Sequence, residues 1–160
     1  YLLGNEQIPL HKRIKICIKP NDKYVDDTTL YVASFTKNGE FVFLGNKNVD
    51  GFIEASTNAL GIYVIAKDSV APRVIPVNFK SNSSIKDNWS LRLEIEDKET
   101  GISKYEMFVN GEWVLADYDP KKKLLMYQVD NHIKKGYNNL EVIVTDMVGN
   151  KKIYKTTLQR

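Results

Sequence analysis

YEMFVNGEWVLA, residues 105–116, is the stretch that decides the fold predicted for this sequence. Two runs of strand-forming residues, 105–109 and 113–116, lie on either side of the dipeptide Asn110-Gly111. Asn-Gly is the strongest short signal for a β-hairpin, because both residues tolerate the positive φ angles of a two-residue turn. We therefore predict a hairpin here, and the same short strands and turn signals recur along the chain.

Residues 13–19 show the strand pattern in its simplest form. Ile14, Ile16 and Ile18 alternate with basic residues and Cys17, which predicts a strand with one apolar face. The other predicted strands are separated mainly by turn residues such as glycine and asparagine. They cover residues 30–35, 41–44, 52–55, 62–66, 74–79, 89–95, 105–109, 113–116, 124–129, 140–145 and 153–158. A single helical turn is predicted over residues 131–136, capped by Asn131 and ended by Gly136.

This pattern predicts an all-β protein with two tandem β-domains. Pro72 and Pro76 lie in a stretch, residues 67–76, that suits a linker or an edge strand. We therefore predict a smaller β-sandwich-like domain over residues 1–70. Residues 71–160 are predicted to form an immunoglobulin-like β-sandwich, because seven short strands in about 90 residues are typical of that fold.

The composition excludes several classes of protein. The 160 residues are 42% hydrophobic and 27% charged, which predicts a folded chain. No apolar stretch approaches the roughly 18 residues that a membrane-spanning helix needs. The net charge of +3 is spread along the chain, with one basic run at residues 121–123. We therefore expect neither a membrane span nor nucleic acid among the partners.

Catalytic chemistry has few candidate residues in this sequence. Cys17 is the only cysteine, so the chain has no internal disulfide and no cysteine-rich zinc site. Lys15 and Lys19 flank it, so it is either a nucleophile or a small residue within a strand. His11 and His132 are the only histidines, and neither an HxH nor an HExxH motif occurs. We expect no catalytic residue, no cofactor and no enzyme activity in this chain.

Acidic residues follow two of the predicted strands and suggest a calcium site. The connections after residues 89–95 and 140–145 lie at the same end of an immunoglobulin-like sandwich. Calcium binds several oxygen ligands that converge in this way. The candidate ligands are Asp97, Glu99, Asp146 and Asn150, with Glu96 beside them. The alternative is that Asp97 and Asp146 only hydrogen-bond the backbone of their own turns.

Aromatic residues form a candidate ligand-binding group in the middle of the second predicted domain. Tyr105, Trp113 and Tyr118 are its members, and Tyr127 is expected nearby. An aromatic face beside polar groups can stack on a sugar ring. Cross-strand packing between aromatic residues is the alternative.

Two pairs of carboxylates are spaced for a shared strand face. They are Glu94 with Glu96 and Asp117 with Asp119. Such a pair can act as acid and base, but charged residues on the solvent face of a sandwich give the same pattern.

Much of the sequence also resembles a known family. The segments are LGIYVIAKDSVAPRVIPVNF (residues 60–79), LRLEIEDKETGISKYEMFVNGEWVLADYD (91–119) and GYNNLEVIVTDMVGNK (136–151). They are similar to the immunoglobulin-like C-terminal region that follows the catalytic domain in Bacteroidetes-type lysostaphin-like (LytM-type) zinc metallopeptidases. Residues 8–20 and 26–56 resemble the β-rich segment that precedes that region.

The resemblance implies an accessory role beside a peptidoglycan-cleaving domain. The family's zinc ligands belong to an HxxxD motif and an HxH motif, and neither is found here, so no catalytic or metal-binding residue is carried over. The matching positions are turn and packing residues, among which Ile102 and Trp113 are expected to be buried. Zinc is expected only in a catalytic domain outside this chain.

The leading hypothesis is thus a non-catalytic accessory region of a secreted, periplasmic or envelope protein. We expect it to be part of a longer protein and to position or stabilise a zinc endopeptidase domain of the same parent chain. The alternative is a module that binds a carbohydrate, peptidoglycan or an envelope protein, or a structural piece of an adhesin.

Overall fold

The computed structural model describes residues 1–5, 8 and 10–160, and its regular structure is almost entirely β. A 3-10 turn at Asp22–Tyr24 is the helical element of the described residues. The chain divides into two compact units. The first comprises Tyr1–Val70, Glu99–Gly101 and Met147–Asn150, and the second comprises Ala71–Lys98, Ile102–Asp146 and Lys151–Arg160. No helix among the described residues has the length and apolarity needed to cross a membrane.

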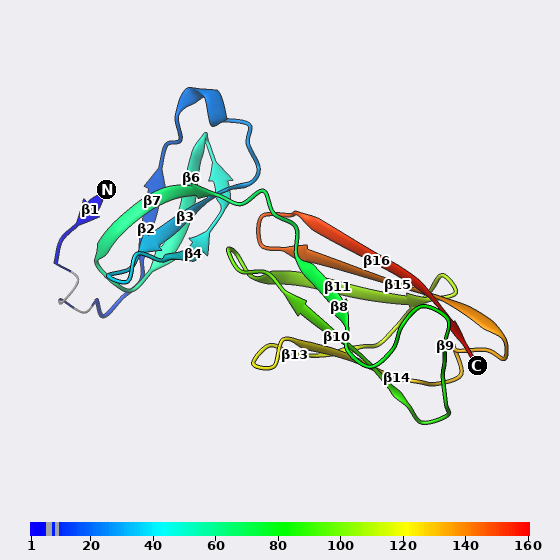
Figure 1. The fold of residues 1–160 in the computed structure, drawn as a ribbon. Helices are drawn as coiled ribbons and strands as arrows, with labels where there is room; N and C mark the ends of the chain where they lie inside the picture. Colours follow the sequence, from blue (N-terminus) through cyan, green and yellow to red (C-terminus); the bar gives the residue numbers. More distant parts are fainter. Residues whose placement is uncertain (6–7, 9) are drawn as a thin grey trace. The chain divides into compact units, whose positions relative to one another are not determined.

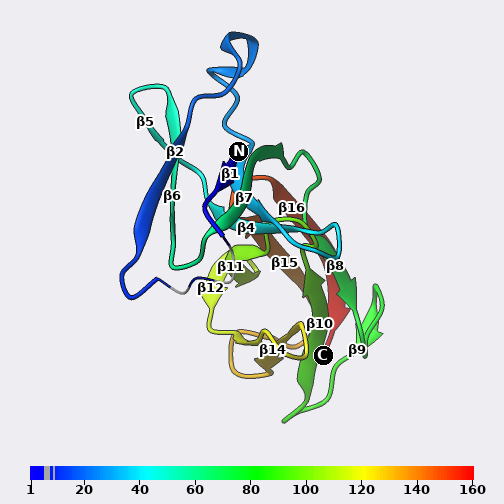
Figure 2. The same cartoon turned by 90° about the vertical axis from the view of Figure 1, so that its left-hand side faces the viewer.

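The first unit is a small sandwich of two antiparallel sheets (Figures 1 and 2). One sheet has the order β1 (Leu2–Leu3), β7 (Gly61–Lys67), β3 (Leu30–Phe35) and β4 (Phe41–Gly45). The other has the order β2 (Ile14–Ile18), β6 (Phe52–Thr57) and β5 (Lys47–Val49).

The alternation along β2 explains how these two sheets pack. Ile16 and Ile18 point into the core with Val32 and Tyr63, whereas Cys17 lies on the exposed face. Gly45 lets the layers approach closely, because a Cβ at this position would lie only 3.1 Å from the Ala55 Cα atom. Burial of this apolar face is the main term that stabilises the first unit.

The second unit is an immunoglobulin-like sandwich, as the sequence predicts. Its first sheet has the order β13 (Asp117–Asp119), β14 (Leu124–Gln128), β10 (Ser90–Glu96) and β8 (Arg73–Pro76). Its second sheet has the order β12 (Glu112–Val114), β11 (Ile102–Val109), β15 (Tyr137–Asp146), β16 (Lys151–Gln159) and β9 (Ser83–Ser84). Leu91, Leu93, Val142 and Val144 are fully buried between the sheets.

The strand count in this unit differs from the prediction. Residues 71–160 form nine strands rather than seven. The predicted strand at 113–116 is in fact β12, which ends at Val114, and β13 begins at Asp117 on the other sheet. The chain changes sheets there, so a single strand over these residues was wrong.

The hairpin of β11 and β12 has the predicted geometry. Asn110 and Gly111 have φ angles of 54° and 85°, which is the left-handed region that a two-residue turn requires. The turn sets the register, so Phe108 lies opposite Trp113 on the neighbouring strand.

The predicted helical turn at residues 131–136 is wrong, because these residues form turns and bends. The side chain of Asn138, only 1% exposed, holds this segment with four hydrogen bonds. Its Oδ1 atom accepts from the Asn110 Nδ2 atom at 2.9 Å and from the Lys134 N–H at 2.7 Å. Its Nδ2 atom donates to the carbonyls of Lys134 at 2.8 Å and Gly136 at 3.0 Å. These bonds replace the backbone pattern of a helical turn.

Two connections between later strands, Glu99–Gly101 after β10 and Met147–Asn150 after β15, are part of the compact first unit. Val148, which follows β15, is 8% exposed and packs in one apolar cluster with Tyr31 and Ala33 of β3. The Asn46 amide donates to the Met147 carbonyl at 2.9 Å. The first unit is therefore assembled from three separate segments of the sequence.

Candidate functional site

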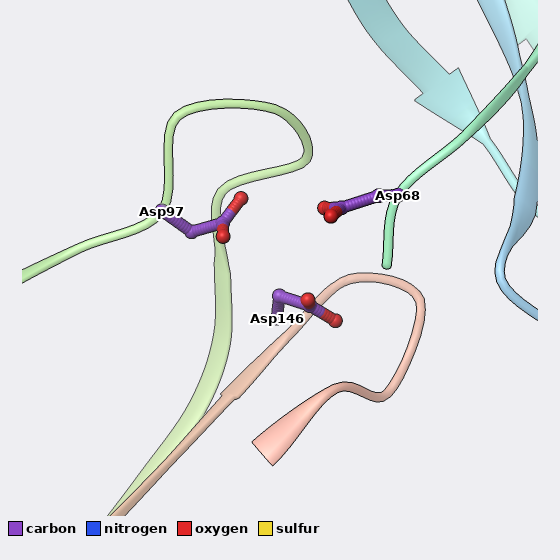
Figure 3. Close-up of side chains that lie close together, drawn as sticks. All are labelled: Asp68, Asp97 and Asp146. Atoms are coloured by element: carbon purple, nitrogen blue, oxygen red, sulfur yellow. The ribbon is translucent and has the colours of Figure 1, made fainter. Parts of the chain in front are cut away.

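The predicted calcium ligands divide between the two compact units. Asp97 and Asp146 belong to the second unit, at the ends of β10 and β15, and each can place a carboxylate oxygen within 4.8 Å of the other. Figure 3 shows both side chains. Asp146 is buried and Asp97 is partly buried. The structure thus brings these two predicted residues together, and the calcium assignment stays a prediction.

Glu99 and Asn150 belong to the first unit, as does Asp68, the third side chain drawn in Figure 3. The buried Asp68 accepts a hydrogen bond from the Thr100 hydroxyl at 2.8 Å and another from the Val70 N–H at 2.9 Å. The Asn150 amide donates to the Asp68 carbonyl at 3.0 Å. Asp68 therefore shapes its own turn and binds two loop residues, a role that sequence analysis missed.

The carboxylate pair Glu94 and Glu96 lies in a network of ion pairs. The Arg73 guanidinium bonds Glu94 and lies 3.3 Å from a Glu96 carboxylate oxygen. The Lys123 ammonium bonds Glu96 and holds the pKa of that carboxyl below its usual range. These charges neutralise one another on the sheet surface, as the solvent-face interpretation predicts.

The Asp119 side chain stabilises the turn that follows β13. Its Oδ1 atom accepts from the N–H groups of Lys121 at 3.0 Å and Lys122 at 3.3 Å, which fixes the turn between β13 and β14. The basic run at residues 121–123 is thus part of a tight connection.

His132 belongs to a side-chain group that is also local. Its Nδ1 atom lies 2.8 Å from the Asp130 Oδ1 atom, which also accepts from the Tyr127 hydroxyl. Burial, together with this bond to Asp130, raises the pKa of Tyr127. The group links the end of β14 to the turn that follows it.

The predicted aromatic residues do not share one exposed surface. Tyr105 and Tyr118 contact each other, with ring centroids 5.5 Å apart, and both pack against the core. Tyr127 is fully buried. Trp113 is 57% exposed, so the expectation that this residue is buried was wrong. The cross-strand packing alternative therefore describes Tyr105 and Tyr118, and Trp113 stands apart from them.

Trp113 begins a row of side chains that crosses the outer face of the five-stranded sheet. Strand pairing places Trp113 opposite Phe108, Phe108 opposite Glu141, and Glu141 opposite Lys155. Directly opposite residues in an antiparallel pair share a face. An exposed aromatic ring, a partly buried aromatic ring and an ion pair thus lie on neighbouring strands.

A shallow hollow of about 640 Å³ adjoins this row. Amide, hydroxyl and charged side chains contribute to its lining, among them Ser81, Asn110, Asn139, Glu141, Lys155 and Thr157. Sequence analysis missed this site. The Asn-Gly turn indicates that Phe108 and Trp113 lie opposite each other, because a two-residue turn sets the register of its hairpin. The residues of β15 and β16 join them only through the pairing of distant strands, which the sequence does not show.

Comparison with known proteins gives one family match. Residues 1–68, which are less than half of the chain, match the Zu5-like domain family. No curated protein matches the chain.

Comparison with solved structures gives matches of low sequence identity. The endo-β-1,4-mannanase from Thermotoga petrophila is 13% identical, with a TM-score of 0.49, and the similarity covers 57% of this chain and 20% of the mannanase. Fibronectin(III)-like modules of Clostridium thermocellum CbhA are 17% identical, with a TM-score of 0.45 and coverage of 94% and 86%. The expansin of Clavibacter michiganensis, in its apo form, is 15% identical, with a TM-score of 0.37 and coverage of 91% and 76%. The chain spans a fifth of the mannanase, and at these identities the likeness concerns the fold alone.

Proposed function

We propose that this chain is a non-catalytic accessory region of a secreted cell-envelope protein. In this proposal it positions or stabilises a catalytic domain of the same parent chain. The region contributes folded β-structure, and the bond-breaking chemistry belongs to the other domain.

The observation that supports this proposal is that the candidate catalytic carboxylates form ion pairs with basic side chains. Glu94 and Glu96 share Arg73, and Glu96 also binds Lys123. An acid–base pair needs one carboxyl group that stays protonated near neutral pH. The Lys123 ammonium favours the charged form of Glu96 instead, which suits a structural ion-pair network.

The nature of the catalytic domain rests on the resemblance described above. We infer that it is a lysostaphin-like zinc endopeptidase that cleaves peptidoglycan. An HxxxD motif and an HxH motif in another domain of the parent chain would support this inference, and a different enzyme in that chain would overturn it.

The experiment that tests the accessory role uses the purified 160-residue chain on peptidoglycan sacculi, with and without added zinc. Soluble muropeptides and new amino termini are measured, and lysozyme serves as the positive control for the release of muropeptides. We expect no release above buffer. Zinc-dependent release by this chain, abolished by a chelator, would show that it is an enzyme and would overturn the proposal.

A further inference from the structure

We propose that the outer face of the sheet β12-β11-β15-β16 binds a β-1,4-linked glycan. In this proposal the sugar rings stack on Trp113 and Phe108, and their hydroxyl groups are hydrogen-bonded in the hollow beside Asn139. The inference goes beyond the accessory role and does not depend on it. It names a ligand class for a site in the second unit.

The aromatic part of the face suits the apolar side of a pyranose ring. Trp113 is exposed and Phe108 lies directly across from it, so the two rings can form one continuous apolar surface. Tyr137, 72% exposed, lies on the same face two residues before Asn139 on β15. Large aromatic side chains supply contact area at a low cost in conformational entropy.

The polar part of the face can supply the hydrogen bonds that orient a sugar. Within the described part of the chain, the Asn139 side chain makes no hydrogen bond, although its neighbour Asn138 makes four. Asn139 alternates with Asn138 along β15 and therefore points to the solvent face. An exposed amide with both donor and acceptor groups can pair with two adjacent sugar hydroxyls.

The shape of the site favours an extended chain over a single sugar. Trp113, Phe108, Glu141 and Lys155 lie on four neighbouring strands, which are about 4.8 Å apart. The row thus measures about 14 Å, which is longer than one pyranose ring. β-1,4-linked glycans present their rings as a flat ribbon, and a sheet face offers a matching flat support.

The charge of the site favours a neutral ligand. The Lys155 ammonium lies 3.0 Å from a Glu141 carboxylate oxygen, so the half of the row opposite the aromatic rings carries no net charge. On the adjoining part of the same face, Lys104 lies 2.9 Å from Glu106. Neither a polyanion nor a basic peptide finds charge complementarity here, whereas a neutral glycan loses no ion pair when it binds.

The test measures binding of two neutral probes, cellohexaose and chitohexaose, to the full chain by calorimetry and tryptophan fluorescence. We expect at least one probe to bind and to change the fluorescence of Trp113. Trp113→Ala should weaken that binding about tenfold or more, as expected for a stacking anchor. Trp113→Phe should retain most of the affinity, and Asn139→Ala should lower it about fivefold.

Phe41→Ala is the matched control, because Phe41 is 52% exposed but lies on a sheet of the first unit. Its affinity for the probes should equal that of the unchanged chain. The preference between the two probes identifies an unsubstituted or an N-acetylated glycan as the source. Absence of binding to both probes at millimolar concentration would overturn the proposal, as would equal affinities of Trp113→Ala and Phe41→Ala. Loss of glycan binding leaves the accessory role intact, because that role is tested by hydrolysis.

Discussion

Asn138 offers the sharpest test of how this structure is stabilised. Its buried amide makes four hydrogen bonds of 2.7–3.0 Å, which tie the turn after β14 to the Asn110-Gly111 hairpin. Each hydrogen bond contributes about 1 kcal/mol net to the free energy of unfolding. When the amide is removed, a partner group that is exposed can form a hydrogen bond with water instead. Lys134 and Gly136 are exposed, so we expect Asn138→Ala to lower the free energy of unfolding by about 2–4 kcal/mol.

The assay is urea denaturation followed by tryptophan fluorescence. Both tryptophans, Trp89 and Trp113, belong to the second unit, so the signal reports that unit alone. A loss of this size should also lower the melting temperature by roughly 10–20 °C in a domain of this length. Asn138→Asp keeps the acceptor but places a carboxylate against two carbonyls, so its loss should be at least as large.

Asn139→Ala is the control for this prediction. The residue has the same chemistry and adjoins Asn138, but it lies on the exposed face, so its replacement should change the free energy by less than about 0.5 kcal/mol. Equal stabilities of Asn138→Ala and Asn139→Ala would refute the reasoning, because the buried network would then contribute nothing measurable.

Three further predictions concern single residues. Val148→Ala removes two buried methyl groups from the cluster with Tyr31. In hydrogen exchange, the free energy that protects the amides of β3, Leu30–Phe35, should fall by about 1.5–2.5 kcal/mol. Unchanged protection would contradict the grouping of Val148 with the first unit. Bonds from Lys67 and Thr29 lower the pKa of Asp27 to about 2, so the stabilisation that this carboxylate gives is present above its ordinary pKa of 3.8 and is lost as the pH falls toward 2. In acid titrations, Asp27→Asn should therefore show a smaller loss of first-unit stability between about pH 4 and pH 2 than the unchanged chain, and parallel curves would count against this assignment. Gly111→Ala should lower the free energy of unfolding, measured by urea denaturation, by about 1–2 kcal/mol, because Gly111 has a φ of 85°. Nothing lies within 4 Å of the added methyl group, so steric overlap does not contribute. An unchanged free energy would exclude backbone strain as the reason for this glycine.

The strands that could be predicted are those in which local pattern and tertiary packing agree. Alternation along β2 and the Asn-Gly turn after β11 require no knowledge of distant residues. By contrast, β1, β9 and β13 contain only two or three residues, which is too short for a two-residue period to be recognised. Their pairing depends on the strand that happens to lie beside them.

The turn before β15 shows why local signals can mislead. Asn131 and Gly136 match the ends of a helical turn, and the same residue types also occur in irregular turns. The deciding residue is Asn138, whose side chain occupies the Lys134 N–H that a regular backbone pattern could use. Nothing in the order of residues shows that this asparagine is buried.

The candidate sites were predictable to different extents. Asp97 and Asp146 were expected at one end of the sandwich, because strand order alone determines that placement, and their carboxylates do approach each other. Trp113 was singled out, but its partners were not, because Phe108, Glu141 and Lys155 join it through sheet register. Register across four strands is a tertiary property, and a one-residue slip would move Glu141 to the other face.

The three-segment assembly of the first unit bears on how this region can be inherited and engineered. The Zu5-like match ends at residue 68, yet Thr100, Val148 and Asn150 complete the surroundings of Asp68 and Tyr31. A gene fragment that stops at Val70 would encode every strand of this unit and still leave out those side chains. Recombination at that boundary would separate residues 1–70 from the loops that complete their unit. The two compact units are therefore expected to be inherited together.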